Sequence, residues 1–232
     1  MYARQLCEHV VSLHKLGIVM LDLKPANVMM EVDKDSLVPT LRFIDGDSWR
    51  MLHEGIGLDA GGGVIETSAF TPMYAAPELL VASAHGTLAA LPATFEMDMA
   101  SLGLCLAMLL SPACTPPFAS DDAAMAAAVS STPPPPAALG CGGSAFASEL
   151  VAALTVVDPV ARGRVSLAGL VEANKFLNAG LKSATAHEAM KIGCVRARGR
   201  GGRVVCGTAL ERLGAVSLGV CVVRGGSVRL CR

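Results

Sequence analysis

The alternation of hydrophobic and polar positions at the start of the chain predicts one helix followed by a β-hairpin. Apolar residues recur at three- and four-residue spacing over residues 1–15, which is typical of an amphipathic helix. Gly17 follows this segment, and a glycine commonly ends a helix at such a position. Two runs rich in strand-forming residues, 28–32 and 40–44, flank a short polar turn and indicate a hairpin. We expect residues 22–27 to form the loop between the helix and the hairpin.

The remainder of the chain is patterned mainly for helices. Residues 46–72 contain many glycines and no regular period, which predicts a long loop. Ser148, Asp98 and Ser166 stand near expected helix starts, where such side chains cap the first turn. The expected fold class is α+β, mainly α-helical, with a short β-hairpin on a helical bundle. The apolar-periodic and alanine-rich segments that predict helices are residues 77–84, 97–110, 121–129, 148–155 and 166–178.

Composition and charge divide the chain into a folded body and a tail. With 52% hydrophobic and 17% charged residues, the chain can bury a sizeable core. Residues 1–181 carry 9 Lys and Arg residues against 18 Asp and Glu residues, whereas residues 182–232 carry 10 against 2. We therefore expect an acidic folded body over residues 1–180 and a poorly ordered, basic Gly/Arg/Val-rich tail over residues 181–232.

Membrane-spanning, secreted and zinc-binding proteins are not expected from what the sequence lacks. The longest apolar stretch, residues 99–110, is shorter than the ~20 residues that a membrane-spanning helix needs. No export signal is recognisable, and the eight cysteines form no C-x-x-C pair, which favours reduced thiols over disulfides or zinc. Residues 196–203 resemble an RNA-binding Arg-Gly-Gly segment but contain no aromatic residue, so nucleic acid is not an expected partner. We expect a cytoplasmic protein, with the nucleus as the alternative.

One loop carries the residues with the clearest chemistry. Residues 17–30 contain Asp22, Lys24 and Asn27 in an Asp-x-Lys-x-x-Asn arrangement, which resembles the catalytic loop of eukaryotic-type protein kinases. Because five motifs occur in the family's order over residues 2–178, the resemblance does not rest on one loop alone. The four further segments that match family landmarks are residues 43–47, 71–78, 98–103 and 158–162.

The resemblance implies a role for each residue of the loop and of the hairpin beside it. Asp22 would accept or orient the proton of a substrate hydroxyl, and Lys24 would contact the γ-phosphate of ATP. Asn27 and Asp45 would supply oxygen ligands to Mg²⁺. Met29 would lie beneath the adenine ring, although an ordinary core methionine on a strand is an equal alternative.

The later motifs imply the substrate specificity and the contacts that hold the fold together. Thr71, which precedes the Ala-Pro-Glu motif, and the spelling of the catalytic loop resemble serine/threonine kinases, so Thr71 is expected to face the substrate. Glu78 and Arg162 are expected to form a buried ion pair. Asp98 is expected to hold the catalytic loop by accepting hydrogen bonds from its backbone N–H groups.

Four positions depart from the family pattern. Met20 and Leu21 replace the His and Arg that usually precede the catalytic Asp, so a phosphate on the activation segment would lack its usual Arg partner. Gly46 replaces the Phe that follows the metal-binding Asp, and Asp47 replaces a Gly.

The sequence also contains no Gly-x-Gly-x-x-Gly loop and no Val-Ala-x-Lys strand before the catalytic loop, so we expect the C-terminal lobe alone. The implied function is transfer of phosphate from ATP, with Mg²⁺, to Ser/Thr hydroxyls of a protein substrate once an N-terminal lobe is supplied. The alternative is a pseudokinase or scaffold that binds a docking partner without catalysis.

Overall fold

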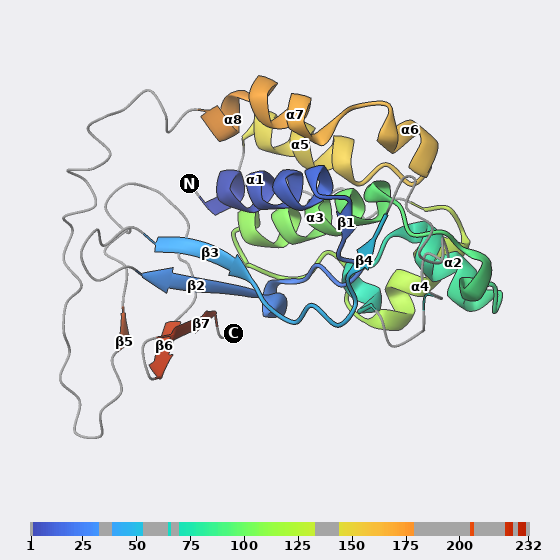
Figure 1. The fold of residues 1–232 in the computed structure, drawn as a ribbon, viewed down its shortest axis with the longest axis horizontal. Coiled ribbons are helices and arrows are strands. Elements are labelled where there is room, and N and C mark those ends of the chain that lie inside the picture. Colours follow the sequence, from blue (N-terminus) through green and yellow to red (C-terminus); the bar gives the residue numbers. More distant parts are fainter. Residues whose placement is uncertain are drawn as a thin grey trace.

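A helical body with two small sheets forms the part of the chain that the structure describes. The computed structural model describes residues 2–32, 39–52, 65, 70–132 and 144–178, and the backbone of residues 205–206, 221–224 and 227–230. Figure 1 shows the hairpin at one end of the body and helices α2 and α4 at the other, with α1 and α3 between them.

The first helix and its glycine stop confirm the sequence pattern. Helix α1 spans Tyr2–Lys15. Gly17 follows with a φ of 73°, and its N–H donates to the carbonyl of His14 at 2.9 Å. A Cβ atom at Gly17 would lie 2.8 Å from the carbonyl oxygen of Leu52, so both the backbone angle and the space require glycine. The turn leads directly into strand β1 (Ile18–Val19).

The predicted hairpin follows the loop. A 3₁₀ turn, η1 (Pro25–Asn27), leads into strand β2 (Val28–Val32), which pairs antiparallel with β3 (Pro39–Phe43). The register runs from Val28 opposite Phe43 to Val32 opposite Pro39. A two-residue strand, β4 (Arg50–Met51), pairs antiparallel with β1 and was not expected, because its pairing is long-range and leaves no local pattern.

The helices agree with prediction in the middle of the chain and differ towards its end. Helix α5 begins three residues before the expected start because Ser144, rather than Ser148, accepts the capping hydrogen bond, from the N–H of Ala147. The expected helix over residues 166–178 is divided at Asn174, whose side chain accepts from the N–H of Leu177 and so starts a new turn. The helical elements are η3 (Pro72–Tyr74), α2 (Pro77–Ala84), η4 (Leu88–Ala90), α3 (Phe95–Leu110), α4 (Asp121–Val129), α5 (Ala145–Leu154), α6 (Pro159–Gly163), α7 (Leu167–Ala173) and α8 (Lys175–Asn178).

Two other helix starts test the expected caps. Ser166 caps α7 by accepting from the N–H of Gly169 at 3.0 Å, as the sequence predicted. Thr94 occupies the N-cap position of α3, so Asp98 is not its cap and lies inside the first turn.

Helix α3 forms the centre of the core. Residues 97–107 of this helix are all buried. They contribute to two apolar clusters, one shared with α1, α5 and α7 and the other with β1, α2 and α4. A Cβ atom at Gly103 would lie 2.7 Å from Thr155 and 2.8 Å from Leu154, so glycine permits the close approach of α5. The central helix thus connects the catalytic loop to the rest of the body.

The basic tail contributes strands that the sequence pattern did not predict. Strands β5 (Val205–Cys206), β6 (Cys221–Arg224) and β7 (Ser227–Leu230) extend the hairpin sheet in the order β3-β2-β7-β6-β5. The contact with β2 places Met30 opposite Val228. The remainder of the tail lies outside the described residues. Within the described part of the chain, no helix is long and apolar enough to span a membrane.

Candidate active site

The catalytic loop brings two of the expected residues, Lys24 and Asn27, onto the carboxylate of a third, Asp22. Lys24 Nζ lies 2.6 Å from Asp22 Oδ2, and the Asn27 amide donates to the same oxygen at 3.2 Å and to the Asp22 carbonyl at 3.0 Å. Pro25 starts the 3₁₀ turn between Lys24 and Asn27, and its fixed φ favours that turn. The hairpin holds the end of the loop, since the N–H of Ile44 donates to the Asn27 carbonyl at 2.9 Å.

The second oxygen of Asp22 is the most informative atom of the loop. Asp22 Oδ1 is buried, and no described group donates a hydrogen bond to it. The side chain as a whole is only 12% exposed. A buried carboxylate oxygen without a donor is costly, on the order of 1–3 kcal/mol. Because Lys24 and Asn27 both contact Oδ2, Oδ1 is the oxygen of this carboxylate that has no donor among the described residues.

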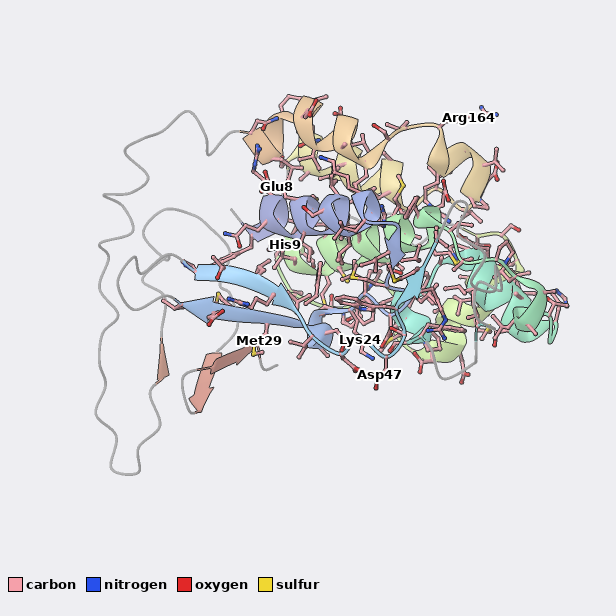
Figure 2. All side chains as sticks on the ribbon, viewed as in Figure 1. Glu8, His9, Lys24, Met29, Asp47 and Arg164 are labelled. Carbon is pink, nitrogen blue, oxygen red and sulfur yellow. The ribbon has the colours of Figure 1, made fainter. Side chains whose placement is uncertain are left out.

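Lys24 connects this loop to the segment before α2. Its ammonium group donates to Thr71 Oγ1 at 2.7 Å while it contacts Asp22. The positive charge therefore lies between the carboxylate of Asp22 and the hydroxyl of Thr71, which is 47 residues from Lys24 in the chain. Figure 2 shows Lys24 and Asp47 along one edge of the body, with Met29 farther along β2.

Asp45 joins Asp22 and Asn27 at one small hollow. All three residues line it, and Asp45 is exposed with a φ of 65° in the left-handed region. Carboxylate and amide oxygens are hard ligands and fit Mg²⁺. Nowhere in the described chain do three or more His, Cys, Asp or Glu side chains gather closely enough to hold a metal ion. A cation here would therefore complete its shell with phosphate oxygens and water.

Met29 lies on β2, opposite Arg42 of β3, and is half-buried. This position on the hairpin is compatible with either of the roles considered from the sequence. Its contact with adenine therefore stays a prediction.

Asp98 holds the catalytic loop through hydrogen bonds from the backbone of the loop. Its carboxylate is fully buried and accepts from the N–H of Met20 at 2.8 and 3.0 Å and from the N–H of Leu21 at 3.0 Å. Leu21 has a φ of 63°, a conformation that costs a leucine roughly 1–2 kcal/mol. His14 Nε2 lies 3.1 Å from Oδ2 of this carboxylate, the oxygen that also accepts from Met20 at 2.8 Å, and the sequence did not indicate this contact. Asp98 therefore offsets the cost of a strained turn directly before Asp22.

Arg162 and Glu78 meet across the core. The Arg162 side chain is fully buried and donates from Nη2 to Glu78 Oε1. Its other nitrogens donate to the carbonyls of Glu96, at 2.8 Å, and Val156, at 2.6 Å. One guanidinium thus joins the start of α2, the start of α3 and the segment before α6.

Two cysteines lie in the core and are unsuited to nucleophilic chemistry. Burial raises the pKa of the Cys7 thiol to about 12. Burial also raises the pKa of Cys105, and the negative charge of Asp22 adds to that effect. Both thiols are therefore protonated at neutral pH.

Comparison with known proteins gives the class of this chain. The family described as the protein kinase domain matches residues 1–163. The chain therefore belongs to the protein kinase domain family, and its mainly helical body with small sheets is compatible with that family. The match begins at residue 1 and does not decide between a whole domain and a C-terminal lobe, which stays a prediction.

Two relatives carry kinase names. The chain is 33% identical over 122 residues to the ovarian-specific serine/threonine-protein kinase Lok of Drosophila melanogaster. The aligned residues make up 52% of this chain and 22% of that protein. It is 34% identical over 110 residues to the smooth muscle myosin light chain kinase of Gallus gallus. This alignment makes up 47% of this chain and 5% of that protein. The chain thus matches less than a quarter of the length of either relative.

Proposed function

We propose that this chain carries the catalytic loop of a serine/threonine protein kinase, which transfers the γ-phosphate of ATP to a protein hydroxyl. The observation that carries the proposal is that the two carboxylate oxygens of Asp22 differ in their contacts. Lys24 and Asn27 both use Oδ2, so Oδ1 is left as an acceptor. Membership of the protein kinase family, whose members generally use ATP and Mg²⁺, supports the same conclusion.

The geometry supports different roles for Asp22 and Lys24. Asp22 Oδ1 accepts the hydrogen bond of the substrate hydroxyl and orients its oxygen toward the phosphate. Lys24, held between Asp22 and Thr71, supplies positive charge beside that oxygen. Phosphoryl transfer depends mainly on positioning and on neutralising charge, so a fixed carboxylate and a fixed ammonium group suit it.

Metal binding would fall to Asn27 and Asp45. Both Asn27 hydrogen bonds to Asp22 use the amide nitrogen, so the amide oxygen is the end that suits a cation. A Mg²⁺ ion held by Asn27 and Asp45 would neutralise charge on the phosphates.

A second candidate function is a docking scaffold without catalysis. Leu21, which stands where the family has an Arg, is 1% exposed and lies in one apolar cluster with Ile65 and Phe70. This cluster holds Ile65 and Phe70, which precede α2, by apolar burial. Such an arrangement also suits a module that only presents its surface to a partner.

The decisive experiment measures transfer of labelled γ-phosphate from Mg²⁺·ATP to serine and threonine peptides. The full chain is assayed alone and with a kinase N-terminal lobe added in trans. We expect transfer with the added lobe and a loss of about 10²–10⁴-fold in the Asp22→Asn variant. Asp122→Asn, the same chemical change at an exposed position on α4, serves as the control and should retain the rate.

The result also separates the two candidates. Unchanged transfer by Asp22→Asn would remove Asp22 from its proposed role. No transfer by the unaltered chain in either condition would favour the scaffold.

A further inference from the structure

The turn that follows β3 places Asp45 in a conformation that needs support. Asp45 has a φ of 65°, and left-handed backbone is unfavourable for most residues with a side chain. The turn is closed by the N–H of Trp49, which donates to the carbonyl of Gly46 at 3.0 Å. Trp49 was not identified from the sequence as part of the site.

The indole ring of Trp49 lies directly on Gly46. A Cβ atom at Gly46 would meet three ring atoms of Trp49 at 3.5 to 3.7 Å, which is ordinary van der Waals contact. The ring therefore packs against the backbone that follows Asp45. Trp49 itself is half-buried and packs against the apolar cluster that includes Met20 and Leu23.

The same turn is tied to the catalytic loop by a hydroxyl. Ser48 Oγ donates to the Met20 carbonyl at 2.7 Å, while the N–H of Met20 donates to Asp98. On the far side, Arg50 of β4 pairs with Val19 of β1. The turn is therefore attached on both sides of Trp49 to the strand and loop that precede Asp22.

Trp49 also faces the metal ligands. It lines the same small hollow as Asp22, Asn27 and Asp45. In the kinase pattern, the position after the metal-binding Asp carries a Phe, whereas this chain has Gly46 and no large side chain there. The structure thus supplies an aromatic ring at the turn from a position three residues later in the chain.

We propose that Trp49 is a positioning residue for Asp45, and that its indole ring replaces the missing Phe by holding the turn against the catalytic loop. This inference rests on the proposed function, because it assigns the turn to metal·nucleotide binding. Outer contacts of this kind typically change metal affinity by about 10–100-fold.

The test uses Mn²⁺·ATP as the probe and the full 232-residue chain. Binding is measured by equilibrium dialysis of labelled ATP at saturating Mn²⁺, a readout that requires no catalysis. We expect Trp49→Ala to weaken binding about tenfold and Trp49→Phe to stay within about twofold of the unaltered chain. Phe146→Ala, which removes an exposed aromatic ring on α5, is the matched control and should bind normally.

A milder variant keeps the test decisive if Trp49→Ala does not fold. Ser48→Ala removes only the hydroxyl that contacts Met20 and should weaken binding about fivefold, as expected for one lost hydrogen bond. Thermal unfolding of each variant separates a loss of affinity from a loss of structure. Because the chain has a single tryptophan, quenching of its fluorescence by Mn²⁺·ATP and not by Mg²⁺·ATP would place the metal near the ring.

The outcomes are distinguishable. If the unaltered chain binds Mn²⁺·ATP and Trp49→Ala binds equally well, the inference is overturned and the proposed function stands. The inference is also overturned if folded Trp49→Phe binds as weakly as Trp49→Ala, or if folded Ser48→Ala binds normally. If the unaltered chain binds no Mn²⁺·ATP either alone or with the kinase N-terminal lobe added in trans, the proposed function fails and the inference fails with it.

Discussion

At the scale of single residues, the site is a set of backbone and side-chain hydrogen bonds arranged around two carboxylates. Asp22 receives its contacts from within its own loop, whereas Asp98 reaches the loop from α3. The spacing of Asp22, Lys24 and Asn27 is local, so the sequence could predict their convergence. Trp49 was missed because its contact with Gly46 depends on a turn that no periodic pattern marks.

Replacing Asp98 should destabilise the fold through the catalytic loop. Asp98→Ala leaves the N–H groups of Met20 and Leu21 without their acceptor, and each buried unsatisfied donor costs roughly 1–3 kcal/mol. We expect a loss of about 2–4 kcal/mol in the free energy of unfolding, measured with urea. Asp122→Ala, at an exposed site, should change it by less than about 0.5 kcal/mol. Equal stability of the two variants would contradict the anchoring role of Asp98.

At the scale of elements, prediction succeeded where local pattern and burial agreed. The apolar run of α3 and the bounded strands of the hairpin were recognisable because each forms within a continuous segment. Helix α6 was missed because its five residues are too few to show a period. The pairing of β1 with β4 joins residues more than thirty positions apart, and only tertiary structure determines it.

From the ion pair between Arg162 and Glu78 we predict that the two side chains are coupled in stabilising the fold. Arg162→Met leaves the Glu78 carboxylate near the core without its cation, which should cost about 3–5 kcal/mol of unfolding free energy. Adding Glu78→Gln removes the unpaired charge, so the double variant should be more stable than the sum of the single losses. A double-mutant cycle measured in urea should give a coupling energy above about 1 kcal/mol. Additive losses would show that the pair is not coupled.

At the scale of the whole molecule, one central helix carries both clusters of the core, and the active-site loop is attached to it. The sequence predicted this body because its helices are strongly apolar. It did not predict that the basic tail would supply β7 beside β2, because Met30 and Val228 lie almost two hundred residues apart. Pairing at that distance is determined by the assembled sheet and not by the neighbouring residues.

The pH dependence of stability is a property of the whole molecule, because it reflects the burial of thiols in the core. The folded state raises the pKa of Cys7 from 9.0 to about 12, so the unfolded chain loses this proton first as pH rises. The contribution to stability is full below about pH 9 and is lost between pH 9 and 12. We expect urea midpoints to fall from pH 8 to pH 10.5, and to fall less in Cys7→Ala. An equal fall in both proteins would contradict the burial of this thiol.

The buried Leu21 has a consequence for the conditions under which the site stays ordered. Its contacts with the cluster of Ile65 and Phe70 are apolar, and the attraction between apolar groups is not screened by salt. Hydrophobic association weakens on cooling. The segment before α2 should therefore keep its place at high ionic strength, where an arginine–phosphate contact would loosen, and should become less firmly held in the cold.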